Sequence, residues 1–435
     1  MKSMLKAFSS IALSGAMVVP ALAGTEAPAT AKDMKKALDD QGINYVQTAQ
    51  KGITLSGYVD TSYTMQFAGK GNPFAQTGPT GATTVAAPGQ TSNLRQFDNN
   101  ANGFNVNAVK LALEKALPDK NDWAAGFRID LMAGSDARNL TNSDPTLGNA
   151  GSSLYVEQAL VKFRVPVGNG LDIYMGKFVT FLGYEVIESP ANLNFSRGLL
   201  FTNAIPLTHT GIYADYKWND TIETKFGIVD GWNSSSSTVA SGGNYGFGGK
   251  AITGQLTITA PGKNANITQS VIYSPDSAEP AASNAGYTDN SGVVVYDIWG
   301  NWNPTFVKDN ALLLGFNGDF GYNSAAGTGF AGAARGSNAW YGFALYSQYK
   351  FTKVFSLAGR LEWLAETAGP GGPLGPGQKF QGTGGSTNDY SATLTANFNL
   401  WENLLTRLEY RHDFLDGAGL PSSQDEISVN AVYSF

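Results

Sequence analysis

Apolar and polar residues alternate in many short stretches of this chain. Between Ile53 and Phe67, the odd positions are mostly apolar and the even positions are mostly polar. Successive side chains of a β-strand point to opposite faces, so each such stretch predicts a strand with one apolar and one polar face. The same pattern recurs in residues 123–131, 252–259, 390–400 and 404–411.

We find 16 stretches of this kind, which predict 16 strands. They begin near residues 53, 104, 122, 154, 170, 208, 221, 249, 265, 292, 310, 338, 353, 388, 403 and 425. In the second stretch the apolar positions change phase between Ala108 and Val109. One extra residue in a strand reverses its faces, so this change predicts a β-bulge.

The connections between the predicted strands alternate in length. Short turns at 117–121, 166–169, 219–220, 261–264, 352–353 and 401–402, with a medium one at 304–310, separate long connections such as 69–102, 133–153, 181–206 and 232–248. Outer-membrane barrels join their strands by short periplasmic turns and long extracellular loops. We therefore expect an all-β fold, a transmembrane antiparallel up-and-down barrel of about 16 strands over residues 52–435.

The composition agrees with a membrane barrel. The chain has 52 Gly, 19 Tyr, 24 Phe and 8 Trp, and only 15% of its residues are charged. After the N-terminal region, no stretch reaches the ~18 apolar residues that a membrane-spanning helix needs. In lipid, every backbone polar group needs a partner within the protein, and a closed ring of strands supplies one.

The N-terminus has the features of an export signal. Lys2 and Lys6 precede an apolar run that ends in Ala-Leu-Ala at residues 21–23. We expect residues 1–23 to be a secretory signal peptide. We expect residues 24–51 to be a partly helical periplasmic segment, which tethers the barrel, plugs it or contacts another chain.

Charge and residue types exclude several function classes. Without the predicted signal peptide, the chain has 27 basic and 35 acidic residues, a formal charge of −8, which argues against a nucleic-acid partner. The chain has no cysteine, which excludes disulfides and thiolate chemistry. His209 and His412 are its only histidines, and no metal-ligand spacing links them. The Asp/Asn-rich stretch 136–144 lacks the spaced ligands of a calcium loop, so we expect no metal and no cofactor.

An enzymatic function is not expected either. An outer-membrane phospholipase would place a serine and a histidine together on the lipid-facing side. Strand parity turns His412 outward, but it turns the nearest strand serines, Ser391 and Ser428, inward.

Charged residues recur on the polar face, which would line the lumen. A barrel of ~16 strands is wide enough to hold an aqueous channel. Parity assigns these side chains to the lumen: Asp60, Arg128, Asp130, Lys162, Arg164, Arg360, Glu362, Arg407, Glu409, Arg411 and Asp413. Arg360, Arg407 and Arg411 could form a basic patch that biases ion passage. Because acids alternate with these arginines, we favour pairing, for example of Arg360 with Glu362 and of Arg407 with Glu409.

Residues 181–206 follow neither a strand nor a helix period. Pro190 and Pro206 interrupt the segment, which mixes many apolar residues with Glu185, Glu188 and Arg197. It begins and ends at the extracellular rim, and its apolar content indicates that it packs against other parts of the chain. We expect it to fold into the lumen and narrow the pore, with Glu185 and Glu188 opposite basic wall residues. A flat cap over the mouth is the alternative.

The last stretch, residues 427–435, alternates and finishes on Phe435. It is similar to the terminal strand that bacterial outer-membrane proteins present to the barrel-assembly machinery, so we expect that machinery to be a partner.

Several motifs together resemble a known family. They are the run GKFVTFLGYE at residues 176–185, ESP at 188–190, FSR at 195–197 and HTG at 209–211, with SGYVD at 56–60, GFRID at 126–130, EQA at 157–159 and GIVDGW at 227–232. This set resembles the OmpL-like β-barrel porins of the outer membrane. The resemblance covers the chain from about residue 53 to its end, and it implies a passive channel in the outer membrane of a Gram-negative bacterium. By analogy with general porins of this size, it also implies a homotrimer.

The sequence therefore predicts an outer-membrane porin that passes ions and small hydrophilic solutes through a water-filled channel. Its partners would be outer-membrane lipid and those solutes. An outer-membrane binding or adhesion protein, which uses long extracellular loops on a non-conducting barrel, is the alternative.

Overall fold

The computed structural model describes residues 52–66, 76–77, 83–84, 97, 102–143, 151–231, 250–275, 292–324, 338–367, 387–417 and 422–435. The predicted signal peptide and the segment 24–51 lie outside these residues.

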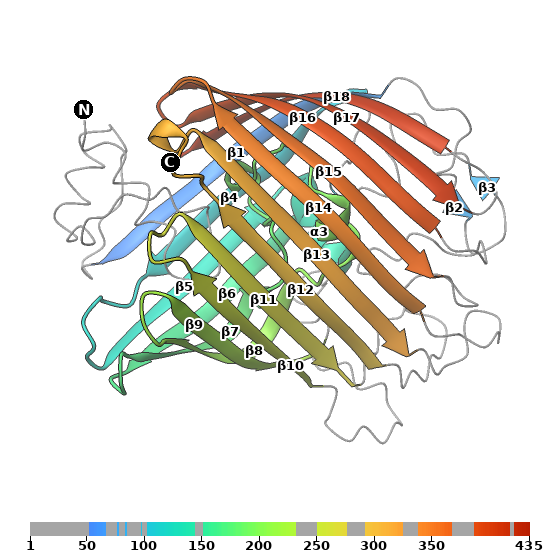
Figure 1. Cartoon of the computed structure of the whole chain (residues 1–435). Coiled ribbons are helices and arrows are strands. Elements are labelled where there is room, and N and C mark those ends of the chain that lie inside the picture. Colours follow the sequence, from blue (N-terminus) through green and yellow to red (C-terminus); the bar gives the residue numbers. More distant parts are fainter. Residues whose placement is uncertain are drawn as a thin grey trace.

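In the described part of the chain, 16 strands form one closed antiparallel barrel (Figure 1). They are β1 (Ile53–Gln66), β4 (Gly103–Lys115), β5 (Ala124–Ala133), β6 (Leu154–Val165), β7 (Leu171–Val179), β8 (Thr208–Lys217), β9 (Ile222–Val229), β10 (Ala251–Thr259), β11 (Ala265–Ser274), β12 (Gly292–Trp302), β13 (Leu312–Ser324), β14 (Asn338–Lys350), β15 (Phe355–Thr367), β16 (Thr387–Trp401), β17 (Leu404–Gly417) and β18 (Ser422–Ser434). Each begins within three residues of its predicted start, so the predicted fold and strand order are confirmed.

Short elements complete the described structure. β2 (Gln76–Thr77) and β3 (Thr83–Thr84) pair with each other. The helices are α2 (Ser135–Ser143), α3 (Leu199–Asn203) and two 3₁₀ turns, η2 (Ser189–Ala191) and η3 (Lys308–Asn310). None of the helices in the described residues has the length and apolar character needed to cross a membrane.

The first and last strands close the ring. β1 pairs with β18 from Tyr58 opposite Ser434 to Gln66 opposite Glu426. Beyond this ladder, the Gly57 amide donates to the Phe435 carbonyl and the Phe435 amide donates to the Gly57 carbonyl, both at 2.9 Å. The C-terminal residue therefore takes part in the closure, which leaves no sheet edge along these strands.

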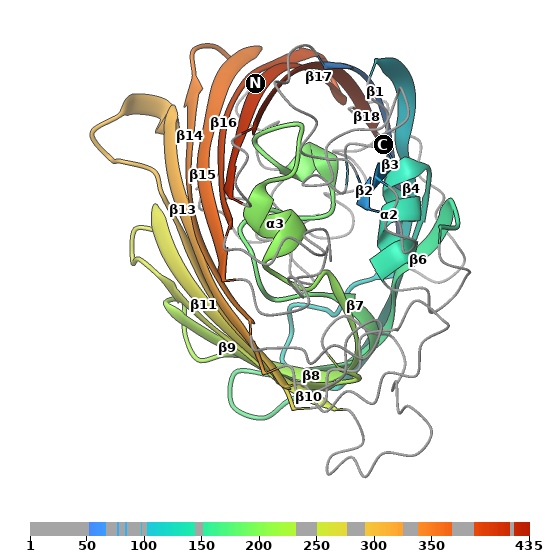
Figure 2. The ribbon, with the colours of Figure 1, turned by 90° about the vertical axis from the view of Figure 1, so that its right-hand side faces the viewer.

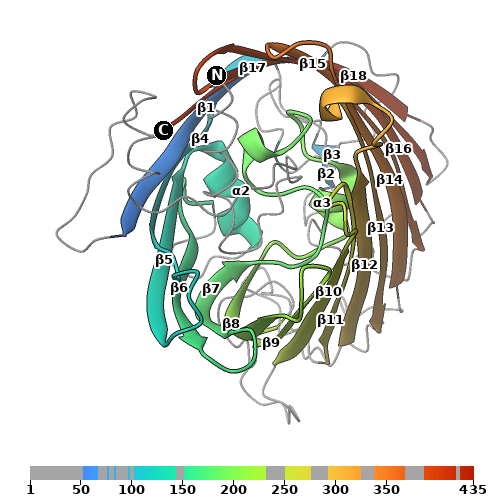
Figure 3. The ribbon, with the colours of Figure 1, turned by 60° about the vertical axis from the view of Figure 1, so that its left-hand side comes forward.

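The two faces of the barrel wall separate as the alternation predicts. Large apolar side chains such as Phe226, Leu394 and Leu408 are exposed on the outside. Polar side chains such as Thr395 and Asn430 are buried on the inside. Figures 2 and 3 look into the ring and show α2 and α3 within it, with α2 along the wall of β4 to β6.

The predicted bulge lies at Asn107 in β4. Asp60 of β1 pairs with Ala108 and Thr61 pairs with Val106, so Asn107 is the extra residue. Its side chain turns inward and donates to Asp60 Oδ1 at 2.7 Å. A second bulge, which the sequence reasoning missed, lies in β6. There Asp130 pairs with Gln158 and Leu131 pairs with Val156, so Glu157 is extra and also points inward.

Deleting Asn107 should destabilise the barrel more than replacing it. Without the extra residue, Phe104 and Val106, which are now 86% and 53% exposed, would turn into the lumen. We expect the deletion to lower the free energy of unfolding by at least about 2 kcal/mol. Asn107→Ala keeps the register and loses only hydrogen bonds, for about 1 kcal/mol. Urea unfolding in lipid vesicles measures both, and equal losses would contradict this account of the bulge.

Candidate functional site

The segment 181–206, which we call the inner segment, connects β7 to β8 and lies inside the ring of strands (Figures 2 and 3). Its large apolar side chains are buried, including those of Phe181, Leu182, Ile187, Leu200 and Phe201. Contacts with the barrel wall hold the inner segment at both ends and along its length.

The first part of the inner segment follows the wall from β10 to β14. The Phe181 carbonyl accepts hydrogen bonds from Gln255 Nε2 at 2.7 Å and from Ser270 Oγ at 3.0 Å. The Tyr184 hydroxyl donates to Asn301 Oδ1 at 2.8 Å, and its ring stacks on Tyr346 with centroids 4.1 Å apart. These contacts fix the backbone of residues 181–184 against four strands.

Glu185 then meets the arginine of β15. Its carboxylate lies 2.6 Å from Arg360, and Arg360 lies 2.8 Å from Glu362. Arg360 also donates to the Ser196 carbonyl at 2.6 Å, while the Gly198 amide donates to Glu185. One guanidinium therefore joins the outgoing and returning limbs of the inner segment to the wall.

Glu188 reaches the other side of the lumen. Its carboxylate forms an ion pair with Lys110 of β4, and Lys110 also lies 3.1 Å from Asp130 and 2.9 Å from Glu157. The bulge in β6 is what turns Glu157 toward Lys110. Oxygen atoms of Asp130, Glu157 and Glu188 lie within 4.8 Å of one another, a spacing that suits a metal ion. The ammonium of Lys110 already bonds to these carboxylates, so we interpret the group as an ion-pair cluster.

The two glutamates differ in their electrostatic surroundings. Burial raises the pKa of Glu185 above its ordinary value, although the charge of Arg360 acts in the opposite direction. Burial also acts on Glu188, but the charge of Lys110 and hydrogen bonds with Glu157 and Lys110 outweigh it, so the pKa of Glu188 is lowered. The ionised form is therefore favoured more strongly at Glu188.

The middle of the inner segment binds β16 and β17. Arg407 donates to the Ser189 carbonyl at 3.0 Å and to the Asn194 carbonyl at 3.2 Å. Glu409 accepts the amides of Phe195 at 2.6 Å and Ser196 at 3.0 Å. The predicted pairing is present for Arg360 and Glu362, whereas Arg407 and Glu409 bind the backbone of the inner segment instead.

Arg197 and the returning limb make further contacts. Arg197 lies 3.1 Å from Asp136 of α2, and its guanidinium lies 5.0 Å from the centroid of the Phe97 ring. α3 packs on β14 and β15, where Trp340 Nε1 donates to the Ala204 carbonyl at 3.0 Å. The inner segment thus contacts both α2 and the opposite wall.

The other predicted pore residues also lie inside the barrel. Asp60 accepts hydrogen bonds from Asn107 and Asn430, and Arg128 lies 2.9 Å from Asp130. Arg411 lies 2.9 Å from Asp413 and 3.2 Å from Glu426. Their assignment to the pore lining stays a prediction.

Sequence reasoning missed Lys110, although the signal was present. Lys110 stands between the outward residues Val109 and Leu111 after the phase change. Its parity therefore turns it into the lumen. The bulge at Glu157 also leaves a signal, because the outward apolar positions change from Leu154 and Val156 to Val161 and Phe163. The signal is harder to see, since Tyr155 and Leu160 are apolar residues on the inward face.

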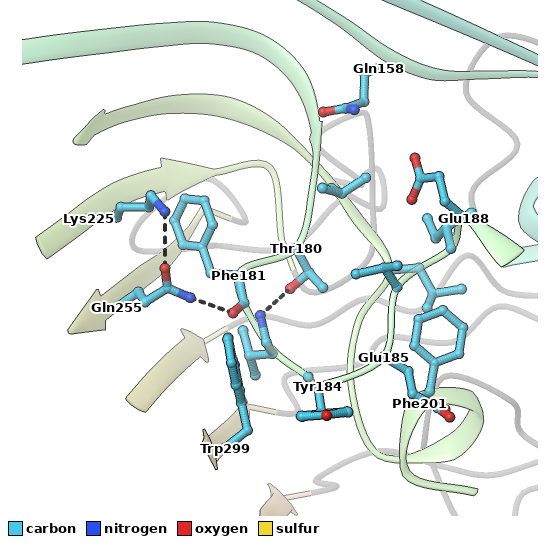
Figure 4. Close-up of a pocket in the computed structure, with 16 residues that line it drawn as sticks. Gln158, Thr180, Phe181, Tyr184, Glu185, Glu188, Phe201, Lys225, Gln255 and Trp299 are labelled. Atoms are coloured by element: carbon cyan, nitrogen blue, oxygen red, sulfur yellow. Dashed lines mark hydrogen bonds between the residues drawn. The ribbon is translucent and has the colours of Figure 1, made fainter. Parts of the chain in front are cut away.

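A pocket lies between the first part of the inner segment and the wall (Figure 4). Its empty volume is about 650 Å³, part of which is open to solvent. Gln158, Lys225, Gln255 and Trp299 line it from the wall, and Phe181, Tyr184, Glu185 and Glu188 line it from the inner segment. This pocket is one space beside the inner segment in the described residues.

Buried acids outnumber buried bases in the described residues. The buried acidic side chains are Asp60, Asp130, Asp136, Glu157, Glu185, Glu188, Asp297, Asp319, Glu362, Glu366, Asp389, Glu409, Asp413 and Glu426. The buried basic side chains are Lys110, Arg128, Lys162, Lys177, Arg197, Lys225, Arg360, Arg407 and Arg411. All belong to barrel strands, α2 or the inner segment.

Comparison with protein families gives one match. The model of the family described as "Putative beta-barrel porin-2, OmpL-like" matches residues 52–435. A comparison with the curated proteins finds no matching sequence.

Comparison with solved structures finds outer-membrane channels. The outer membrane channel DcaP of Acinetobacter baumannii has a TM-score of 0.53 at 12% identity, over 89% of this chain and 99% of that one. The anion-selective porin from Comamonas acidovorans has a TM-score of 0.52 at 12% identity, over 88% and 99%. A trimer form of OmpT from Vibrio cholerae has a TM-score of 0.51 at 10% identity, over 88% and 99%. At these identities the likeness concerns the fold.

Gly321→Ala should loosen the returning limb of the inner segment. Gly321 pairs with Trp340, and a Cβ at Gly321 would overlap the indole ring that donates to Ala204. We expect the free energy of unfolding to fall by about 1–3 kcal/mol, because the ring must shift. Gly318→Ala on the same strand is the matched control, since its Cβ would meet nothing closer than 3.5 Å. Urea unfolding in vesicles measures both, and equal stabilities would show that the Trp340 contact is unimportant.

Proposed function

The chain belongs to the OmpL-like β-barrel porins, and we propose that the inner segment sets the width of its channel. The protein is a porin of the bacterial outer membrane. In our proposal, ions and small hydrophilic solutes diffuse passively through the water-filled lumen, and they pass beside the inner segment.

Two ion pairs of the inner segment support this proposal. Glu185 forms an ion pair with Arg360 of β15, and Glu188 forms one with Lys110 of β4. Since β4 and β15 belong to different sides of the ring, residues 185–188 bridge the lumen between them (Figure 2). A 16-strand barrel without such a bridge would enclose a much wider aqueous channel.

The charged residues of the inner segment have positioning roles in this proposal. Glu185 and Glu188 hold the segment to the two walls, and Arg197 holds it to α2 through Asp136. Asp60, Arg128, Asp130, Arg360, Arg407 and Arg411 form the charged lining beside it. The pocket lined by Gln158, Lys225 and Gln255 offers the space for solutes.

We do not assign an enzymatic activity to the barrel. His412 lies on the outer side, where its Nδ1 is 2.8 Å from Asp425, whereas Ser391 and Ser428 are buried. This arrangement separates the serines from the histidine, so it does not support a lipid hydrolase.

Two partners belong to the proposal. The likeness to a porin described in a trimer form supports a homotrimer. The position of Phe435 at the closing seam supports recognition of the C-terminal strand by the barrel-assembly machinery, because that strand pairs with β1 to complete the ring.

Deleting residues 185–200 should raise the single-channel conductance in a planar bilayer. The deletion removes the bridge between β4 and β15, so we expect an increase of about twofold or more. Deleting residues 233–248, an equally long piece of another long connection, is the matched control and should change the conductance less. An unchanged conductance after deletion of 185–200 would favour a cap over the mouth. A barrel that inserts and never conducts would favour the binding or adhesion protein.

A further inference from the structure

Acidic side chains outnumber basic ones inside the barrel, with fourteen buried aspartates and glutamates and nine buried lysines and arginines in the described residues. Charges on the low-dielectric wall of a narrow channel act across its aqueous lumen. We propose that the channel passes cations in preference to anions. This inference rests on the proposed function, because it concerns the solutes that pass the inner segment.

At three places inside the barrel, one basic side chain lies within ion-pair distance of two or more acidic side chains. Lys110 lies within ion-pair distance of Asp130, Glu157 and Glu188. The other two places are the pairs of acids around Arg360 and around Arg411. When the acids are ionised, each group has a net negative charge, so these cations offer little attraction to a passing anion.

The strands from β10 to β13 contribute no positive charge that would attract an anion. The sequences of these four strands contain no lysine and no arginine, and their acidic residues are Asp297 and Asp319. The two aspartates are register partners on β12 and β13, and they are 0% and 4% exposed. Like charges directly opposite each other are unfavourable, so this pair gains from a positive charge nearby.

The hydrogen bonds of this pair leave most of its charge uncompensated. Asn317 Nδ2 donates to Asp297 Oδ2 at 2.6 Å. Asp297 Oδ1 and both carboxylate oxygens of Asp319 receive no hydrogen bond from a donor group within the described residues. Two carboxyls this close can share one proton, but the pair then still keeps one negative charge. Asn317 and the backbone amide of Gly183, which also bonds to Asp297, are neutral donors, so a cation in the lumen still gains from the charge of this pair.

The same wall forms part of the solute path. Gln255 of β10 and Trp299 of β12 line the pocket beside the inner segment, and Trp299 is two residues from Asp297 on the same strand. Lys225 of β9 also lines this space, but it lies 3.1 Å from Glu223 and 3.9 Å from Asp215, so it adds no net positive charge. A cation in this space therefore approaches a negative wall, whereas an anion is repelled by it. The preference thus arises from β12 and β13 as well as from the acid-rich groups around Lys110, Arg360 and Arg411.

The test is the reversal potential of the full-length refolded protein in a planar bilayer with a potassium chloride gradient. We expect its sign to show that potassium permeates more readily than chloride. Asp297→Asn with Asp319→Asn should lower the ratio of potassium to chloride permeability by about twofold or more. Asp425→Asn is the matched control, because Asp425 bonds to His412 and Tyr410 on the outer side, and it should leave the ratio unchanged.

A preference for chloride, or no preference, in a conducting wild-type channel would overturn the inference and leave the proposed channel intact. An unchanged ratio in the double variant would overturn the role of the pair. If that variant does not fold, the single variant Asp297→Asn tests the same effect, since it removes one of the two facing carboxylates and leaves Asp319 in place. A protein that inserts without conducting would contradict the proposed function itself.

Discussion

The pairing of β1 with β18 closes the sheet, and the remaining features of the molecule depend on that closure. In lipid an unpaired backbone amide or carbonyl is costly, so a sheet with a free edge is not stable there. The ladder from Tyr58 to Gln66, with the two bonds between Gly57 and Phe435, removes that edge. Once the ring is closed, alternate side chains have only two environments, lipid outside and a polar interior inside.

That interior explains how a long irregular connection becomes ordered. The inner segment cannot satisfy its own backbone with a ladder, so it uses charged wall residues as partners. Glu409 accepts two of its amides, Arg407 donates to two of its carbonyls, and Arg360 binds both limbs. These three buried charges are tolerated because each one has specific partners in the inner segment. Among all the buried charged residues described, however, the acids outnumber the bases.

Much of this arrangement could be predicted because strand parity is a local rule. Once the alternation was read, the inward positions of Asp60, Arg360 and Arg411 followed from counting residues. The bulge at Asn107 was also predictable, since the apolar positions shift by one at Ala108. The bulge at Glu157 was missed, although the outward apolar positions shift from Val156 to Ala159 and Val161, because apolar Tyr155 and Leu160 on the inward face blur the alternation. Bulges re-aim single side chains, and this one directs Glu157 to Lys110.

The sequence by itself determined the closed barrel, the number and order of its strands, and which side chains face inward. These follow from a period of two residues and from the need to satisfy the backbone in lipid, and both are properties of adjacent residues. The tertiary structure alone decided the partners of the charges. Glu188 meets Lys110, Arg197 meets Asp136, and Glu409 meets the amide of Phe195, over separations of 78, 61 and 214 residues. No local period contains such pairings, because they depend on the curvature of the ring and on the path of one connection across it.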